Sequence, residues 1–168
     1  RALLLTGAGR AFCAGQDLAS VPLDGAVQPD LGAIVRRQYN PTIVALVAMP
    51  KPVVCAVNGV AAGAGANLAL ACDIVIASAR ASFVQSFAKI GLVPDSGGTY
   101  LLPRLVGRAR AAGLALLGEA LTAQQAMEWG LVWNVCEPER LMPEALALAH
   151  RLARAPTKGL ALTKRALA

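Results

Sequence analysis

Histidine and closely spaced cysteines, which commonly build metal or redox sites, are scarce in this chain of 168 residues. It has one histidine, His150, and four cysteines that stand far apart without a C-x-x-C spacing: Cys13, Cys55, Cys72 and Cys136. The pattern matches no metal-ligand spacing, so no metal is expected. It indicates cysteines that act as small buried hydrophobic residues in a reducing cytoplasm, and no secretory signal is visible.

Charged and aromatic residues are also few. Charged residues make up 15% of the chain, against roughly 25% in an ordinary soluble domain, and hydrophobic residues make up 56%. This balance predicts a subunit interface. The net charge of +6 favours an anionic partner, but only 4% of the residues are aromatic, the basic residues are scattered and there is no nucleic-acid motif. A phosphorylated small molecule is therefore expected rather than DNA or RNA.

One uncharged run, residues 52–72, is long enough to cross a bilayer and contains a G-x-x-x-G pair. However, Asn58 and Gly59 form a turn signal, Asn67 is polar, and alanine and glycine give weak hydropathy. We interpret the run as a buried strand followed by a buried helix, with no membrane partner.

Strand and helix patterns alternate along the chain, which predicts an α/β fold in one domain of residues 1–168. Apolar residues at helical spacing before residue 50 are interrupted by Pro41, and a small-residue helix begins near Gly63. Thr122 and Gln125 have the spacing of a capping box. Strands are expected at residues 2–9, 52–59, 74–78 and 131–137, and a C-terminal helical region from about residue 141.

Both ends of the chain look cut. The first residue, Arg1, leads directly into a strand pattern, and the last residues stop inside a helical pattern without a stop signal. The expectation is that the chain is a piece of a longer protein.

The glycine-rich segments do not fit a dinucleotide-binding loop, because the third glycine position after Gly63 and Gly65 falls on Leu68. A helix starting there could present backbone N–H groups to a carbonyl oxygen that gains negative charge. Tight packing of the helix against the sheet explains the same residues, and spacing alone favours that explanation.

Three aspartates have structural explanations on residue type alone. Asp17 is expected to cap the turn that follows it, and Asp73 to accept from backbone donors where the Gly65 helix ends. Asp95, in "GLVPDSGGTY", fits the N-cap of a helix that begins near Gly97 better than it fits a catalytic role.

Four segments together carry a resemblance: "LTGAGRAFCAGQDL", "PVVCAVNGVAAGAGANLALACDIVIAS", "FAKIGLVPDSGGTYLLPRLVG" and "LTAQQAMEWGLVWNV". They cover nearly the whole chain in order, and they resemble the enoyl-CoA hydratase/isomerase, or crotonase, superfamily. The resemblance implies a spiral of ββα units with C-terminal helices, assembled as trimers or hexamers. It implies a cytoplasmic enzyme that binds acyl-CoA, with coenzyme A as part of the substrate and no separate cofactor.

The resemblance also implies roles for individual residues. The backbone N–H groups of Gln16 and Ala64 would hold the thioester oxygen. Phe87 and Tyr100 would line the acyl pocket, although plain core packing explains them equally well. The coenzyme A moiety would lie along Ala14, Gly15, Gln16, Asp17 and Leu18.

Two departures from the family pattern point to the reaction. Asn67 and Phe87 stand where hydratases of the family carry two glutamates, so hydratase activity is not expected. Asp95 matches the carboxylate base of the isomerase branch, and Asn67 would orient the substrate or this base. The expected activity is an acyl-CoA isomerase that acts through a thioester enolate, either rearranging a ring epoxide or moving a double bond. A non-catalytic CoA-binding or assembly module is the alternative.

Overall fold

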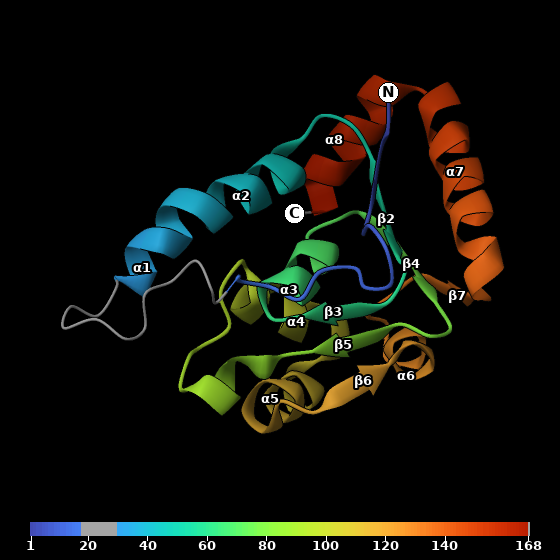
Figure 1. The fold of residues 1–168 in the computed structure, drawn as a ribbon. Coiled ribbons are helices and arrows are strands. Elements are labelled where there is room, and N and C mark those ends of the chain that lie inside the picture. The colour runs from blue at the N-terminus through green and yellow to red at the C-terminus, as the bar shows by residue number, and fades with distance from the viewer. Residues whose placement is uncertain (18–29, 168) are drawn as a thin grey trace.

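The computed structural model describes residues 1–17 and 30–167, in which strands and helices alternate (Figure 1). This alternation confirms the predicted α/β class. One sheet is parallel throughout and consists of β1 (Leu3–Thr6), β2 (Val53–Val57), β4 (Ile74–Ser78) and β7 (Asn134–Cys136), in that order. The other sheet consists of β3 (Val60–Ala62), β5 (Ser82–Val84) and β6 (Ala120–Thr122), with β5 and β6 antiparallel.

Helices follow the strands and also close the chain. Before β2 the helical path consists of α1 (Leu31–Ile34), the π-helix η2 (Val35–Tyr39) and α2 (Asn40–Ala48). After β3 come α3 (Ala64–Leu70), the 3₁₀-helix η3 (Ser86–Ile90), α4 (Gly98–Val106), α5 (Arg108–Leu117), α6 (Ala123–Glu128), α7 (Pro138–Arg154) and α8 (Thr157–Leu167).

A repeated unit of two strands and a helix connects the two sheets. β2 leads into β3 and then α3, and β4 leads into β5, η3 and α4, so each unit adds one strand to each sheet. This is the predicted spiral of ββα units. The sequence analysis missed β3 and β6, because strands of three residues are too short to show an alternating pattern.

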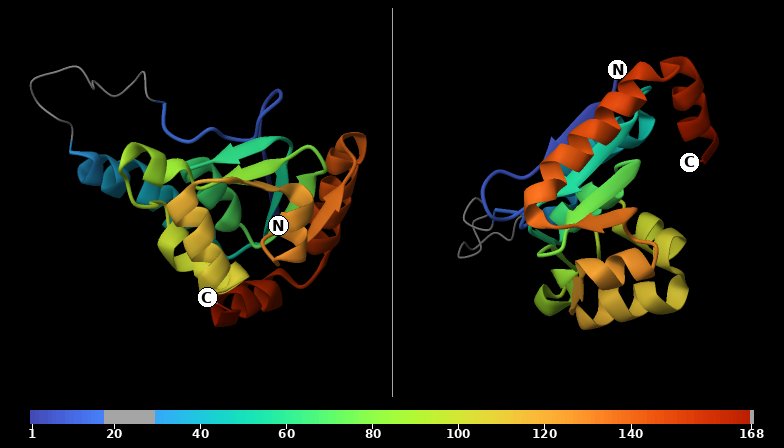
Figure 2. Two further views of the ribbon diagram at one scale, coloured as in Figure 1. Left: turned by 90° about the horizontal axis from the view of Figure 1, so that it is seen from below. Right: turned by 90° about the vertical axis from the view of Figure 1, so that its right-hand side faces the viewer.

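The parallel sheet is covered on both faces. Every residue of β2 is buried. On one face Val54 and Ile76 pack against Leu141 and Ala145 of α7, which runs along the sheet in Figure 2. On the other face the larger core cluster joins β2 to α3, α4 and α6. α7 begins at Pro138, three residues before the predicted start, because proline is well suited to the first turn of a helix.

The predicted interruption of the helix at Pro41 was wrong. The helical path continues through this residue, and the π-helix η2 ends two residues before it. The Asn40 N–H donates to the Val35 carbonyl, five residues back. Pro41 lies in the first turn of α2, where the fixed φ of proline suits a helix. The predicted capping box at Thr122 and Gln125 is confirmed at the start of α6.

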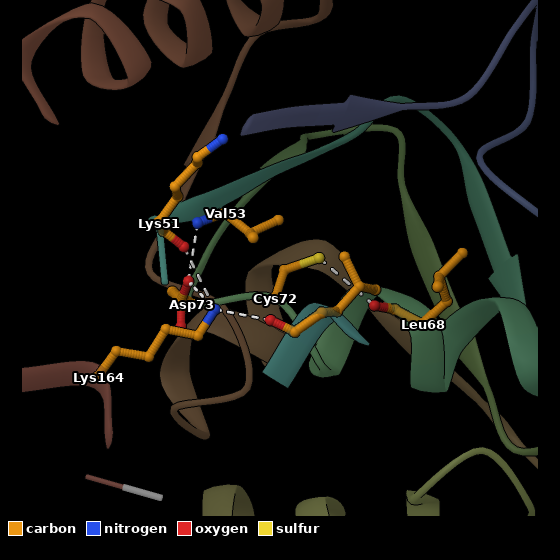
Figure 3. A network of polar contacts seen from close by, with 7 residues as sticks. Lys51, Val53, Leu68, Cys72, Asp73 and Lys164 are labelled. Atoms are coloured by element: carbon orange, nitrogen blue, oxygen red, sulfur yellow. Dashed lines mark hydrogen bonds and ion pairs between the residues drawn. The ribbon is translucent and has the colours of Figure 1, made fainter. Parts of the chain in front are cut away.

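A partly buried ion pair joins α8 to the segment between α3 and β4 (Figure 3). Lys164 Nζ donates to Asp73 Oδ2 at 2.8 Å and to the Leu46 carbonyl at 2.7 Å. Asp73 Oδ2 also accepts from the Val53 N–H at 2.7 Å. Asp73 therefore accepts from a backbone donor as expected, but this donor begins β2 instead of lying at the end of α3.

We expect Lys164→Met to lower the free energy of unfolding by about 2 kcal/mol, because it leaves a largely buried carboxylate without its charged partner. The value is below that of a fully buried pair, since Asp73 keeps the Val53 N–H and its side chain is 25% exposed. Urea unfolding measures the change. Lys158→Met on the exposed surface of the same helix is the matched control, and an equal effect of the two variants would contradict this account.

Candidate active site

Asp95 lies in the loop between η3 and α4, and its backbone is held from two sides. The Asn67 Nδ2 atom donates to the Asp95 carbonyl at 2.9 Å, and the Gly98 N–H donates to it at 2.8 Å. α4 has Gly97 as its N-cap residue and no side-chain cap, so the cap hypothesis for Asp95 was wrong. Its backbone carbonyl, not its carboxylate, is tied to the helix start.

Asp95 is one of the residues that line a cavity of about 330 Å³, which we call the Asp95 cavity. The cavity brings together residues from the segment after β1, the start of α3, and η3 with the loop after it. Of the predicted site residues it contains Ala14, Gly15, Gln16, Ala64, Phe87 and Asp95. Apolar side chains form much of the remaining wall: Leu31, Ile34, Val35, Ile90 and Leu92.

The electrostatic state of Asp95 differs from that of an exposed aspartate. Burial raises the pKa of its carboxyl group, while the Ser96 hydroxyl and the Asp95 backbone N–H act in the opposite direction. Burial has the largest effect on this pKa, and Asp95 Oδ1 has no hydrogen-bond partner among the described residues. A poorly solvated carboxylate is a stronger base than usual.

Asn67 is completely buried and acts through Asp95 instead of lining the cavity. Besides its bond to the Asp95 carbonyl, its Oδ1 atom accepts from Gln85 Nε2 at 2.8 Å. Gly98 packs so closely that an added Cβ would lie 2.3 Å from Asn67 Nδ2. Asn67 thus links α3, the segment after β5 and the Asp95 loop. The sequence analysis missed Gln85, which no motif marks.

Gln16 and Ala64, whose backbone amides are predicted to hold the thioester oxygen, both line the Asp95 cavity. Ala64 is the first residue of α3, where an N–H has no partner within the helix. No backbone hydrogen bond from either amide is formed within residues 1–17 and 30–167. Gly15 and Gly63 precede them with φ of 93° and 53°, values that favour glycine.

Tyr39 is a further polar residue near the site, and no signal in the sequence singled it out. Its hydroxyl donates to Gln16 Oε1 at 2.5 Å. With Ser96, Ile43 and Leu68 it lines a second cavity of about 200 Å³, which shares Gly15 and Ala64 with the Asp95 cavity. We call this the Tyr39 cavity.

The structure does not bring every predicted site residue to the cavity. Tyr100 is 50% exposed on α4, and the Arg104 guanidinium lies over its ring at 3.5 Å. Asp17 is not among the residues that line either cavity. Leu18 lies outside the described residues.

The described cysteines and acidic residues form no metal-binding group of three or more with histidine. All four cysteines are free; Cys55 and Cys72 are buried as predicted, whereas Cys13 and Cys136 are partly exposed. Within the described part of the chain, no helix has the length and apolar character needed to cross a membrane.

Comparison with known proteins identifies the class. The family model described as "Enoyl-CoA hydratase/isomerase" matches residues 1–168, and the chain belongs to this family. It is 60% identical over 168 residues to the 1,2-epoxyphenylacetyl-CoA isomerase of Escherichia coli K12, covering 99% of this chain and 64% of that protein. It is 46% identical over 142 residues to the trans-2-decenoyl-[acyl-carrier-protein] isomerase of Streptococcus mutans, covering 83% of this chain and 53% of that protein.

Solved structures of the family share the fold. The crystal structure of an enoyl-CoA hydratase from Bacillus anthracis superimposes with a TM-score of 0.92 at 36% identity, covering 99% of this chain and 64% of that one. This confirms the crotonase-like fold. The chain spans between 53% and 64% of the length of these relatives.

Proposed function

We propose that the protein is an acyl-CoA isomerase that acts through a thioester enolate, with Asp95 as its single acid-base residue. The observation that carries the proposal is that Asp95 lines a largely apolar cavity and has a buried Oδ1 atom with no hydrogen-bond partner among the described residues. A carboxylate in this state can accept a proton from carbon and release it again.

In the proposed reaction the proton removed from the substrate is returned to the same molecule at another carbon. The Asp95 carboxylate takes a proton from the α-carbon, and the electron pair moves onto the thioester oxygen. The amides of Gln16 and Ala64 stabilise the resulting enolate by hydrogen bonds. The protonated Asp95 then returns the proton to another carbon of the conjugated system, so substrate and product are isomers and no cofactor is consumed.

The proposed substrate is 2-(1,2-epoxy-1,2-dihydrophenyl)acetyl-CoA, whose ring epoxide would rearrange to the seven-membered oxepin-CoA in phenylacetate catabolism. Support comes from the name of the E. coli relative at 60% identity. The apolar wall that includes Phe87, Ile90 and Leu92 suits a ring. A second candidate is a Δ3,Δ2-enoyl-CoA isomerase, which needs the same single base and is favoured by the S. mutans relative.

Hydration fits this site less well, because adding water to a double bond needs groups that handle both the water and the α-carbon proton. Phe87 cannot titrate, and both functional atoms of Asn67 are already hydrogen-bonded inside the protein. The proposal includes assembly as a trimer or hexamer. Exposed apolar side chains such as Leu116, Leu117 and Trp133 are compatible with further interfaces.

The decisive experiment offers the intact protein three CoA thioesters: the ring epoxide, a linear 3-enoyl-CoA and crotonyl-CoA. We expect the highest kcat/KM with the epoxide and no appreciable hydration of crotonyl-CoA. Faster turnover of the 3-enoyl-CoA would establish the second candidate. Hydration as the main activity would refute the proposal, and binding of all three without turnover would indicate a non-catalytic CoA-binding module.

A further inference from the structure

The hydrogen bond between Tyr39 and Gln16 joins segments 23 residues apart in the chain. Tyr39 ends the π-helix η2, whereas Gln16 lies in the irregular segment after β1. Among the residues that the structure describes, this is the only hydrogen bond that Gln16 makes. The Tyr39 hydroxyl therefore restrains Gln16, which lies outside any helix or strand.

The backbone that leads into Gln16 is anchored at Cys13. Cys13 is fixed to the second sheet, since its N–H donates to the Val60 carbonyl and its carbonyl accepts from the Ala62 N–H. Among the described residues, Ala14, Gly15 and Gln16 make no backbone hydrogen bond with one another or with the rest of the chain. Gly15 has φ of 93°, which favours glycine. The side-chain bond from Tyr39 is therefore a restraint on the direction of the Gln16 N–H.

The surroundings of Tyr39 keep it a hydrogen-bond donor. Burial raises the pKa of its phenol, and the charges of Asp95, Cys13 and Asp17 raise it further. The phenol stays protonated across the neutral range, so it donates and the Gln16 side-chain oxygen accepts. π-helical turns are frequent at functional sites, which agrees with the placement of Tyr39 beside this segment.

We propose that Tyr39 is a positioning residue that holds the Gln16 side chain so that the Gln16 backbone N–H points at the thioester oxygen. This inference rests on the proposed function. It assigns Tyr39 no contact with the reacting atoms. An error of about 1 Å in the direction of a stabilising group can cost about 10²-fold in rate.

Steady-state kinetics of Tyr39→Phe, Gln16→Met and the double variant test the coupling. Each single variant is expected to lower kcat about tenfold, with little change in KM, because the lost interaction acts mainly on the enolate-like transition state. The double variant should be no slower than the slower single variant. Multiplicative losses would overturn the proposal. Gln124→Met, on the exposed surface of α6, is the matched control and should behave as wild type.

A binding measurement separates this inference from the proposed reaction. Cinnamoyl-CoA has a carbonyl in conjugation with its ring, and hydrogen bonds to that carbonyl shift its absorption to longer wavelength. The wild-type protein should produce this shift, and Tyr39→Phe should reduce it by more than half with less than a threefold change in Kd. Gln16→Met provides the same test if Tyr39→Phe does not fold.

The outcomes are distinguishable. A full shift in both variants would overturn the role of Tyr39 while leaving the isomerase proposal intact. If Tyr39→Phe reduces the shift but the wild-type protein turns over neither isomerase substrate, the role of Tyr39 would be supported and the isomerase proposal refuted. No shift with the wild-type protein would refute both, because the two amides would then not polarise a thioester.

Discussion

Asp95→Asn is expected to lower kcat for isomerisation by about 10²-fold to 10⁴-fold, the usual contribution of a positioned general base. Asparagine has nearly the same shape, and the bonds from Asn67 and Gly98 go to the backbone carbonyl, so the loop should keep its position. Binding should be affected much less than the chemical step, because in the proposed mechanism backbone amides, and not the Asp95 carboxylate, hold the thioester oxygen. Single-turnover kinetics with the ring-epoxide thioester measures the loss.

Two observations keep this prediction specific. Glu119→Gln, an exposed carboxylate outside both cavities, should leave the rate unchanged. Circular dichroism and thermal unfolding of Asp95→Asn should match the wild type. A folded Asp95→Asn protein with normal kcat would remove Asp95 from the mechanism.

The raised pKa of Asp95 sets the direction of the pH dependence expected for the wild-type enzyme. The base must be unprotonated to react, so kcat/KM should fall as the pH falls through this pKa. Because burial shifts the pKa upward, the fall should begin at higher pH than the ordinary aspartate value of about 3.9 would give. An acid limb at or below that value would mean that the carboxyl is well solvated when the substrate binds.

The strands and helices that could be predicted from the sequence are those marked by a continuous run of apolar residues or by a capping motif. β2 is apolar throughout, and β4 is apolar up to its last residue, Ser78, because helices cover both faces of their sheet. The start of α6 is marked by a capping box. β3 and β6 have only three residues each, and their pairing partner β5 lies elsewhere in the chain. Such strands depend on tertiary contacts that local sequence does not encode.

The candidate site could be predicted in part. Residue type alone favoured Asp95 as a helix cap, yet Ser96 and Gly97 adopt positive φ, Gly97 is the N-cap residue, and Asp95 lines the cavity. The family resemblance supplied Gln16 and Ala64, which line the same cavity. Tyr39 and Gln85 were missed because each acts through one hydrogen bond across a long chain separation, which leaves no periodic or motif signal.

Asn67→Leu is expected to lower the free energy of unfolding by about 3 kcal/mol and kcat by more than tenfold. Leucine has a similar size but no polar atoms, so the Asp95 carbonyl loses one of its two donors and Gln85 Nε2 loses its acceptor in a buried setting. The orphaned Gln85 group costs about 1–3 kcal/mol, and the lost bond to the Asp95 carbonyl about 1 kcal/mol. Gln85 Oε1 already lacks a partner, so this side chain would have none among the described residues. Urea unfolding and steady-state kinetics measure the two effects.

Gly98→Ala separates the positioning role of Asn67 from its role in stability. The added methyl group would lie 2.3 Å from Asn67 Nδ2, so either the Asn67 side chain or the backbone at residue 98 must move. Asn67 itself is still present in this variant and can still form hydrogen bonds. The loss of kcat should therefore be large relative to the loss of stability, the reverse of the balance in Asn67→Leu. Normal kcat in Gly98→Ala would mean that the Asp95 loop keeps its position without Asn67, and that Asn67 serves the fold alone.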